Sequence, residues 1–399
     1  MAEAPWLTIV GIGEDGPDGL SEASRAAIAD AQIVMGPPRH LALLPDVTAQ
    51  TIPWPIPFAD GIDQLLALRG RKAVMLASGD PFWFGAGSTL ARRLDPGEWR
   101  SLPAPATFSL AANRLGWPLE TTWTFGLHAA SLTRIRPALA PGARIIALLR
   151  DGAAVAPLAR VLADARFGAS RLWLLEALGG PRERITEATA ETLPETAFQH
   201  PLCVAIEVAG RGDSLPLTSG MDDSWFDNDG QITKRPVRAL TLSALAPRPG
   251  DQLWDIGAGS GSVAIEWLLA HPSLDATAIE ADPERARRLR DNAARLGVDR
   301  LRVVEGKAPG ALEGLIPPQA VFIGGGLDQA LLEVLGDVLA AGTRVVANAV
   351  TLESEELLVA AHRRLGGDLM RVEIARAAPL GGRTGWKPAY PIVQWSHVL

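Results

Sequence analysis

The feature that most constrains the fold is the alternation of strand-like and helix-like runs along almost the whole chain. Short apolar runs are followed by segments rich in Ala, Leu and Arg at helical spacing. This alternation is typical of α/β proteins with mainly parallel strand pairing. In the first half, the predicted strands are "WLTIVGIG", "QIVMG", "KAVMLASGD", "RIIALLRDG", "RLWLLEALG" and "LCVAIEVAG".

The alternation is interrupted by a polar stretch rich in Gly, Asp and Ser. At roughly 150 residues per domain, 399 residues favour at least two domains. We therefore predict a domain at 1–210, a linker at 211–219 and a second domain at 220–399, which starts with an irregular segment (residues 220–233). Seven strands are predicted after this segment, and the last two are joined by the loop "APLGGRTGWKPA". This arrangement predicts an antiparallel hairpin that closes an otherwise parallel sheet.

Composition limits the classes of partner. A net charge of −7 argues against broad nucleic-acid binding, which needs clustered Lys and Arg. The single cysteine, Cys203, excludes an internal disulfide and a Cys-based zinc site, and we predict no metal. Cys203 lies in the apolar run "PLCVAIEVA", so we expect a buried thiol.

The sequence indicates neither membrane insertion nor secretion. No uninterrupted apolar run approaches the ~20 residues that span a bilayer. The N-terminus carries no basic stretch before its apolar residues, as a secretory signal would. We therefore expect a cytoplasmic protein without a membrane partner.

A glycine loop, "WDIGAGSGSVAIEW", joins a predicted strand to a predicted helix. Gly257, Gly259 and Gly261 follow Asp255, and such glycines permit a tight turn and close approach of a ligand. The G-x-G-x-G spacing differs from the dinucleotide pattern G-x-G-x-x-G, which disfavours an NAD-dependent oxidoreductase. Glu280 ends the next predicted strand, where an acidic group is expected to accept hydrogen bonds from a ribose.

This loop and the seven-strand layout resemble the Rossmann-like (class I) methyltransferases that use S-adenosylmethionine. The flanking segments "GMDDSWFDNDGQITKRPVRALTLSAL", "EGKAPGAL", "VFIGGG" and "ANAVTLESEE" resemble the C-terminal methyltransferase of cobalamin biosynthesis, which acts on precorrin-6. The resemblance implies a set of cofactor contacts: Thr233, Gly257, Ala258, Gly259, Ser260, Gly261, Glu280 and Ala308. Lys307 stands where that family often has an acid. "FIGGG" replaces the Asn-Pro-Pro-aromatic motif of amino-methyltransferases, which opens space for a bulky acceptor.

The run "VGIGEDGPDGLS" resembles the opening of tetrapyrrole methylases, with Glu14 where a proline is frequent. Alone, it is equally compatible with a turn before a helix capped by Ser21. "ASGDPFWFGAG" and "PAPATFSLAANRLGWP" strengthen the resemblance, which implies a fold of two α/β subdomains. It also implies cofactor contacts by Ser78, Gly79, Asp80, Trp83, Ala106 and Thr107, and a macrocycle bordered by Gly11 and Gly13.

For two polar residues of this half, the sequence is compatible with more than one role. Asp80 is also compatible with a helix N-cap before Pro81. His40 is equally compatible with a structural role and with a substrate contact.

Over essentially its whole length, the fusion resembles the decarboxylating precorrin-6Y C5,15-methyltransferases. The resemblance implies two S-adenosylmethionine sites, methyl transfer to meso carbons 5 and 15, and loss of carbon dioxide from an acetate side chain. No His–Asp or Cys–His constellation stands out, and reactions between well-aligned partners need none. The catalytic residues therefore remain unassigned.

A tetrapyrrole with many carboxylates needs cationic contacts, which we predict at Lys234, Arg235, Arg383 and Lys387. We expect a homo-oligomer. The alternatives are a double methyltransferase for another porphinoid or small molecule, and a non-catalytic module that binds S-adenosylmethionine. Intact glycine loops in both halves disfavour a sensor, because a sensor needs only one site.

Overall fold

The computed structural model describes residues 5–399, which divide into two compact units. The first unit comprises residues 5–132 and 138–213, and the second comprises Thr133–Pro137 and Ser214–Leu399. Along the chain, the main change of unit falls between Asp213 and Ser214. No helix within residues 5–399 is both long and apolar enough to cross a membrane.

The first unit begins with a parallel five-stranded sheet in the order β3-β2-β4-β1-β5. Its central strands form because their apolar runs are buried on both faces, as parallel sheets require. Its strands are β1 (Leu7–Ile12), β2 (Ile33–Gly36), β3 (Gln50–Pro53), β4 (Ala73–Ser78) and β5 (Trp99–Leu102). Its helices are α1 (Glu22–Ala29), α2 (Pro38–Ala42), α3 (Phe58–Leu66) and α4 (Gly87–Ala91).

The second sheet of this unit has the order β6-β7-β10-β8-β9, and only β6 and β7 pair in parallel. The expectation of mainly parallel pairing is wrong here, because the connection from β8 to β9 is too short for a crossover. The strands are β6 (Thr122–Gly126), β7 (Arg144–Leu149), β8 (Arg171–Glu176), β9 (Arg184–Thr189) and β10 (Leu202–Glu207). The helices are α5 (Thr107–Leu115) and α6 (Val155–Asp164).

Four strands of the first unit have no counterpart among the predicted ones: β3, β5, β6 and β9. Each lies at an edge of its sheet. An edge strand is covered on fewer sides, so it needs no continuous apolar run and gives a weak sequence signal.

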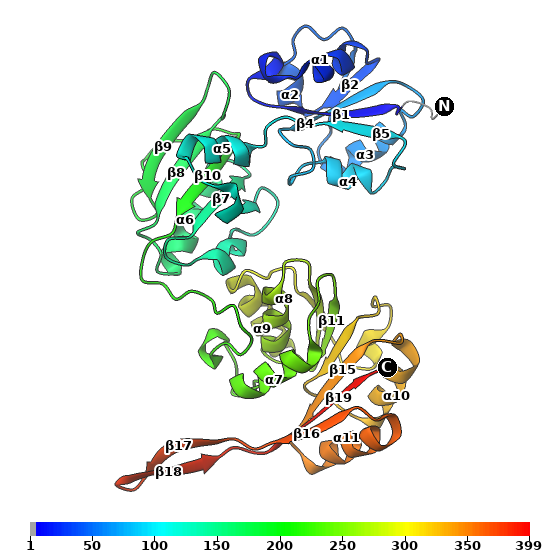
Figure 1. The fold of residues 1–399 in the computed structure, drawn as a ribbon, viewed down its shortest axis with the longest axis vertical. Coiled ribbons are helices and arrows are strands. Elements are labelled where there is room, and N and C mark those ends of the chain that lie inside the picture. Colours follow the sequence, from blue (N-terminus) through cyan, green and yellow to red (C-terminus); the bar gives the residue numbers. More distant parts are fainter. Residues whose placement is uncertain (1–4) are drawn as a thin grey trace. The chain divides into compact units, whose positions relative to one another are not determined.

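The second unit holds the seven strands that we predicted, in the order β13-β12-β11-β14-β15-β19-β16. All neighbours pair in parallel except β19, which runs antiparallel to both β15 and β16. The strands are β11 (Gln252–Ile256), β12 (Asp275–Glu280), β13 (Arg302–Glu305), β14 (Ala320–Ile323), β15 (Arg344–Ala349), β16 (Asp368–Val372) and β19 (Ile392–Val398). This is the Rossmann-like sheet with a closing antiparallel strand (Figure 1).

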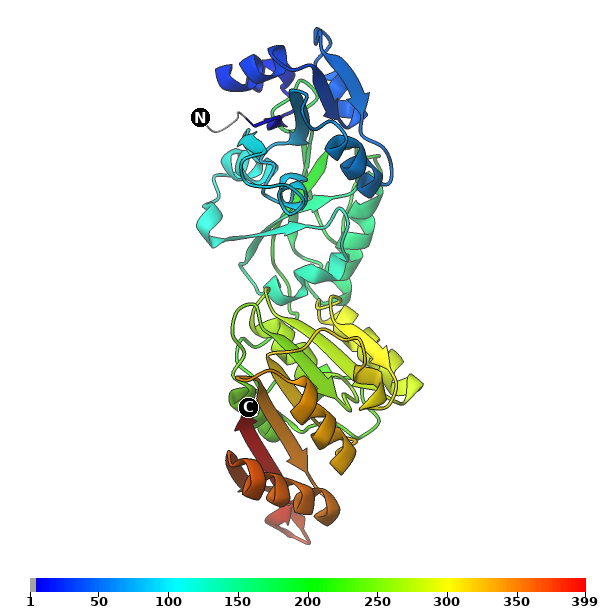
Figure 2. The same cartoon turned by 90° about the vertical axis from the view of Figure 1, so that its right-hand side faces the viewer.

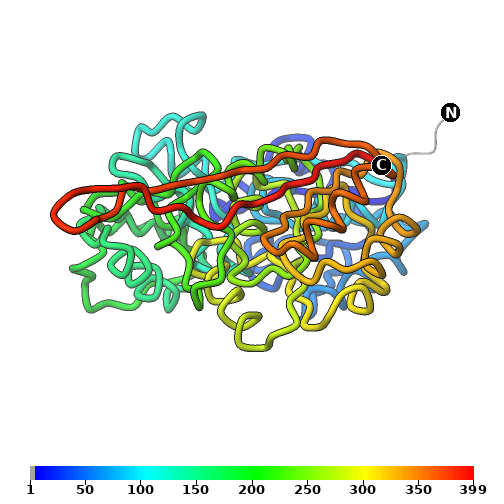
Figure 3. Tube along the Cα trace, turned by 90° about the horizontal axis from the view of Figure 1, so that it is seen from below, coloured from blue at the N-terminus to red at the C-terminus, as the bar shows by residue number. Residues whose placement is uncertain are grey.

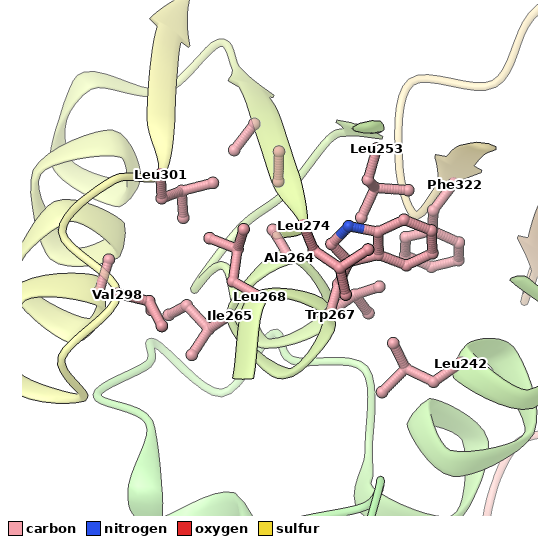
Figure 4. Packing of buried hydrophobic residues seen from close by; sticks show 14 of the residues in the cluster. Leu242, Leu253, Ala264, Ile265, Trp267, Leu268, Leu274, Val298, Leu301 and Phe322 are labelled. Carbon is pink, nitrogen blue, oxygen red and sulfur yellow. The ribbon is translucent and has the colours of Figure 1, made fainter. Parts of the chain in front are cut away.

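Helices cover both faces of this sheet, and a separate apolar core lies under each set (Figure 2). One core joins the strands to α7 (Arg235–Leu245), α8 (Ser262–Ala270) and α9 (Pro283–Arg295). Trp267 of α8 lies in it beside Leu253 and Phe322 (Figure 4). The other core joins the strands to α10 (Gln329–Val338) and α11 (Leu352–Leu365).

The loop predicted between the last two strands of the sheet is itself a two-stranded ribbon. Its strands are β17 (Ala375–Leu380) and β18 (Arg383–Pro388). In Figures 1 and 3, the two strands run side by side away from the sheet to a closed tip. The ribbon has no apolar alternation, because most of its residues are exposed on both faces.

Candidate functional site

The glycine loop follows β11 and leads into α8, and its three glycines have different neighbours. All three have positive φ, between +57° and +76°, which favours glycine. A Cβ on Gly257 would lie 2.7 Å from the backbone of Gly325, and one on Gly261 would lie 2.7 Å from Leu289. A Cβ on Gly259 would meet only the carbonyl oxygen of Gln231, at 3.7 Å. The backbone at Gly259 is therefore the part of the loop that a ligand can approach.

Glu280 lies directly beside this loop. Its buried carboxylate accepts hydrogen bonds from the backbone N–H of Gly259 at 2.8 Å and of Asp282 at 2.9 Å. A carboxylate has about four acceptor sites, so both oxygens remain able to accept bonds from hydroxyl groups. The structure thus brings together the predicted glycine loop and the predicted ribose acceptor.

Three buried polar atoms of this stretch lack partners among the described residues: Trp254 Nε1, Asp255 Oδ1 and Ser260 Oγ. Asp255 Oδ2 accepts a bond from the backbone N–H of Ala264 at 3.1 Å. Burial, with a further contribution from the charge of Glu280, raises the pKa of Asp255 to about 7. Buried polar atoms without a protein partner in this stretch fit the presence of a polar ligand.

The irregular segment (residues 220–233) is held by a buried ion pair. Arg238 of α7 donates to Glu266 of α8 at 2.6 Å, and both side chains are almost completely buried. The Glu266 carboxylate also accepts bonds from the backbone N–H groups of Gly220 and Met221 at 2.6 and 3.0 Å. Arg238 donates in addition to the carbonyl oxygens of Met221 and Thr233. This network fixes the backbone of the predicted cofactor residue Thr233.

Asn292 of α9 ties the same segment to the glycine loop. Its side-chain amide donates to the carbonyl oxygens of Asp227 at 2.9 Å and of Ser260 at 3.0 Å, and its oxygen accepts from the Asp227 N–H. A buried asparagine with all these bonds satisfied keeps the two segments in register.

The remaining predicted positions of this half vary in exposure. Ala308 is buried in the core on the α10 face, whereas the neighbouring Lys307 is exposed. Gly325 approaches Gly257, so part of the space predicted at "FIGGG" is filled by the glycine loop. A Cβ on Gly326 would meet nothing within 4 Å.

The predicted cations lie in two places. Lys234 and Arg235 are exposed at the start of α7, next to Thr233. Arg383 and Lys387 lie on β18, in a regular strand where we expected irregular backbone. The ribbon leaves the sheet between Val372 and Ile392, at the edge where β11 and β15 end. The glycine loop lies at this same edge.

Register places the cations of the ribbon on one face. Arg376 is directly opposite Lys387, and Leu380 is opposite Arg383. Alternation puts all four side chains on one face, with Trp386 on the other. Cations directly opposite each other repel, so an anion bound to this face would stabilise the ribbon.

In the first unit, three predicted segments meet at the end of β1. A Cβ on Gly11 would lie 2.0 Å from the carbonyl oxygen of Gly79 and 2.5 Å from Ala104 N. A Cβ on Gly79 would lie 3.1 Å from the Cα of Ala106, the residue that precedes α5. Gly11 is therefore fully packed, and it serves the close approach of these segments.

Other residues of these segments border the same region. Thr107, the first residue of α5, and Gly13 are partly exposed. Trp83 stacks on Phe108 with ring centroids 5.2 Å apart. Asp80 accepts a bond from the N–H of Phe82 at 2.8 Å within a turn, so it does not cap a helix at Pro81. Ser21 caps α1 through the N–H of Ser24.

His40 is buried and contacts Ser78. Its Nε2 lies 3.1 Å from Ser78 Oγ and 2.8 Å from a guanidinium nitrogen of Arg39. Burial, together with the charge of Arg39, lowers the pKa of His40 to about 3, so the ring is neutral. A ring with this pKa is a weak base at neutral pH.

Sequence reasoning missed Arg238, Glu266 and Asn292. A signal existed for two of them. Glu266 is the only charged residue in the helix "SVAIEWLLA", and Arg238 shares the buried stripe of α7 with Thr241, Leu242 and Leu245. A charge on an apolar stripe indicates a buried partner.

Comparisons with known proteins cover both units. A family model described as "Tetrapyrrole (Corrin/Porphyrin) Methylases" matches residues 6–194, and one described as "Precorrin methyltransferase domain" matches residues 224–399. The chain is 52% identical to a decarboxylating precorrin-6Y C(5,15)-methyltransferase from Sinorhizobium sp, over 98% of this chain and 96% of that protein.

Two further matches cover part of the chain. A decarboxylating cobalt-precorrin-6B C(15)-methyltransferase from Salmonella typhimurium is 35% identical over 40% of this chain and 85% of its own length. A crystal structure of the C-terminal domain of precorrin-6Y C5,15-methyltransferase from Rhodobacter capsulatus is 52% identical, with a TM-score of 0.45, and covers 46% of this chain and 100% of that chain.

Replacing Arg238 by Met should lower the free energy of unfolding by about 3–5 kcal/mol, because Glu266 is left buried without its partner. Arg287→Met is the matched control. Arg287 pairs with Glu284 on the surface, so its loss should cost less than about 1 kcal/mol. Urea denaturation measures both, and equal losses would contradict a structural role of the buried pair.

Asp255 should make stability depend on pH. The folded state keeps its proton up to about pH 7, whereas the unfolded chain releases it near pH 4. The contribution of Asp255 to the free energy of unfolding is therefore greatest below about pH 4. It falls by at most about 1.4 kcal/mol per pH unit as the pH rises towards 7. Asp255→Asn keeps an oxygen that accepts from the Ala264 N–H. The asparagine does not titrate, so this contribution to stability does not fall with pH in the variant.

The free energy of unfolding of Asp255→Asn, relative to that of the unsubstituted chain, should therefore increase between pH 5 and pH 7. Urea denaturation across this range checks the prediction. A difference that does not vary with pH would mean that Asp255 is ionised in the folded protein throughout.

Proposed function

Because the chain belongs to the family of decarboxylating precorrin-6Y C(5,15)-methyltransferases, we propose that it adds methyl groups to meso carbons 5 and 15 of precorrin-6Y. We propose that the same chain releases carbon dioxide from an acetate side arm, as a step of cobalamin biosynthesis. The observation that most supports this function is the accessible backbone of Gly259 beside the carboxylate of Glu280. It offers a place for a cofactor that carries a ribose.

S-adenosylmethionine is the methyl donor that the methyltransferase family implies. We propose two binding sites for it. In the second unit, Glu280 accepts from the ribose, the loop from Gly257 to Gly261 borders the methionine portion, and Thr233 and Ala308 contact the adenosine through their backbone. In the first unit, Ser78, Gly79, Asp80, Trp83, Ala106 and Thr107 form the site.

Bound S-adenosylmethionine would supply an electrophilic methyl group to an electron-rich enamine carbon of the reduced macrocycle. Each transfer would break the S–CH₃ bond of the donor, release S-adenosylhomocysteine and a proton, and replace C–H by C–CH₃. The protein aligns the two partners, and good alignment contributes roughly 7–11 kcal/mol. Arg238, Glu266 and Asn292 support this alignment by fixing the segment beside the loop.

We propose that each unit performs one methyl transfer, with domains at 1–210 and 220–399 and a linker at 211–219. We place decarboxylation in the second domain, with the macrocycle as the electron sink. The Salmonella typhimurium relative is named for methylation of C15 together with decarboxylation. By this analogy, the second domain methylates C15 and the first methylates C5.

The carboxylates of the macrocycle need cationic partners near the second site. We propose the basic face of the ribbon, Arg376, Arg383 and Lys387, together with Lys234 and Arg235 at the start of α7. Within residues 5–399, the three ribbon cations have no acidic partner within ion-pair distance, so their charges are available. Gly13, which is partly exposed, would border the macrocycle in the first unit, and the packed Gly11 would support the segments around it.

We also propose that the chain assembles into a homo-oligomer through the other face of the ribbon. Trp386 is 77% exposed on that face, and a large exposed aromatic residue favours contact with another surface. A two-fold axis would bring the same face of two copies together.

Incubation of the purified chain with isotopically labelled S-adenosylmethionine and precorrin-6Y, followed by mass spectrometry, tests the function. The expected product carries two labelled methyl groups and has lost one carbon dioxide. Transfer to another porphinoid only, or binding without transfer, would overturn the proposal.

Replacing Gly259 by Val should abolish the transfer performed by the second domain. A β-branched side chain is strained at a φ of +57°, and it fills the space proposed for the cofactor. The expected product carries one new methyl and keeps its acetate carboxylate. Gly250→Val is the matched control, because Gly250 also has positive φ but precedes β11 at the other edge of the sheet.

The acetate carboxylate tests the assignment of decarboxylation separately. If Gly259→Val gives a product that has lost carbon dioxide without its second methyl group, decarboxylation does not depend on this loop.

Replacing Glu280 by Gln should weaken one class of cofactor site. An amide offers one acceptor oxygen where the carboxylate offers two, and both oxygens face backbone N–H groups. A charged hydrogen bond contributes about 1.5–3 kcal/mol, which corresponds to roughly a ten- to hundredfold change in affinity. Calorimetry with S-adenosylhomocysteine should show one weakened site and one unchanged site. Glu284→Gln, on the exposed surface of α9, should leave both unchanged.

Sedimentation should report a mass above the 42.2 kDa of one chain. Trp386→Lys should shift the population towards 42.2 kDa, because a charge at the contact opposes its burial. A wild-type protein that sediments as a monomer would contradict the homo-oligomer.

A further inference from the structure

The first unit contains a cluster of three arginines and two glutamates, to which the sequence analysis assigned no role. Glu14, which follows β1, is 7% exposed and accepts hydrogen bonds from Arg39 and from Arg182, the latter at 3.0 Å. Glu176, at the end of β8, binds Arg184 through both oxygens at 2.5 and 2.7 Å. Glu14 is therefore shared between two guanidinium groups, whereas Glu176 pairs with one guanidinium group and also accepts from the backbone N–H of Gln199.

A cavity of about 240 Å³ lies at this cluster, beside the connection from β8 to β9. It is lined by Glu176, Ala177, Arg182, Arg184 and Gln199. Ala177 has a φ of +45°, in the left-handed region that alanine seldom adopts. Such backbone strain is concentrated at functional sites.

Most N–H donors of Arg182 are free to bind a ligand. Of its five N–H groups, the one bonded to Glu14 is the only one with a hydrogen-bond partner among the described residues, and its side chain is 55% exposed. Arg39, in contrast, also reaches His40 and Ser78, so its guanidinium is held in place. The open donors at the cavity therefore belong to Arg182.

The electrostatic field at the cluster is positive. Burial and then the charge of Arg182 lower the pKa of Arg39. Burial and then the charge of Arg39 also lower the pKa of His200, so this ring adds no charge. Three arginines against two glutamates leave a net charge of about +1 on these five side chains, which favours an anionic ligand.

We propose that this cavity binds a carboxylate on a flexible side arm of the macrocycle. Arg182 contacts that carboxylate directly, and Glu14 is a positioning residue that orients Arg182 and Arg39. The inference rests on the proposed function, since it requires a substrate rich in carboxylates. Arg–carboxylate pairs are directional, so this contact also selects which arm of the macrocycle faces the site.

The methionine portion of S-adenosylmethionine is a second source of a carboxylate. We assign the cavity to the macrocycle, because its lining comes from β8, β9 and residues 177–199 and includes none of the predicted cofactor residues. The test therefore measures binding of both kinds of ligand.

The experiment uses the full chain and three variants: Arg182→Gln, Arg182→Lys and Arg114→Gln. Uroporphyrin, a porphyrin with eight carboxylates, is the macrocycle probe, and binding is followed by equilibrium dialysis and by hydrogen exchange of residues 176–200. Arg114→Gln is the control, because Arg114 pairs with Glu183 on the same surface but does not line the cavity.

Arg182→Gln should weaken one class of uroporphyrin site about ten- to hundredfold and remove the protection of residues 176–200. Arg182→Lys should retain more of the affinity than Arg182→Gln, and Arg114→Gln should match the unsubstituted chain. Binding of S-adenosylhomocysteine should stay unchanged in all variants.

Equal binding of uroporphyrin by Arg182→Gln and the unsubstituted chain would overturn the inference and leave the proposed function standing. A loss of S-adenosylhomocysteine affinity in Arg182→Gln would assign the cavity to the methionine carboxylate and also overturn it. Failure of the unsubstituted chain to bind uroporphyrin while it still binds S-adenosylhomocysteine would overturn the inference, whereas the proposed function is judged by the products formed from precorrin-6Y.

Discussion

The ion pair between Arg238 and Glu266 is the interaction on which the glycine-loop edge of the second unit depends. Two charges are buried there, and the desolvation this costs is offset only because nearly every donor and acceptor is used. The partners used are backbone groups of the irregular segment. A stretch without a helix or strand of its own thus gains a defined path, and it places Thr233 beside the glycine loop. Hydrophobic packing alone would not specify that path.

Much of this architecture could be predicted from sequence, because its determinants are local. Apolar strand runs, the glycine loop and Glu280 each carry a signal within a few residues, and the structure brings the loop and the acid to 2.8 Å. The edge strands and the ribbon from β17 to β18 could not be predicted in this way, since exposed strands lack a repeating apolar pattern.

The Arg39, Glu14 and Arg182 cluster was beyond sequence reasoning for another reason. Its members are separated by up to 168 positions, and no spacing rule connects them. We expected Arg383 and Lys387 in irregular backbone, but they lie on β18. Register decides whether their side chains share a face, and register is set by pairing with the partner strand β17. Contacts between distant segments are thus visible only in the folded chain.

The contact between Gly257 and Gly325 joins the turns that follow β11 and β14. A Cβ on Gly257 would lie 2.7 Å from the backbone of Gly325, so a side chain at Gly257 would displace the turn after β14. The reverse does not hold, because a Cβ on Gly325 would lie 3.8 Å from Gly257, which is an ordinary contact distance. The turn after β14 can therefore accept a side chain at Gly325 while the glycine loop keeps its shape, whereas the glycine loop cannot change at Gly257 alone.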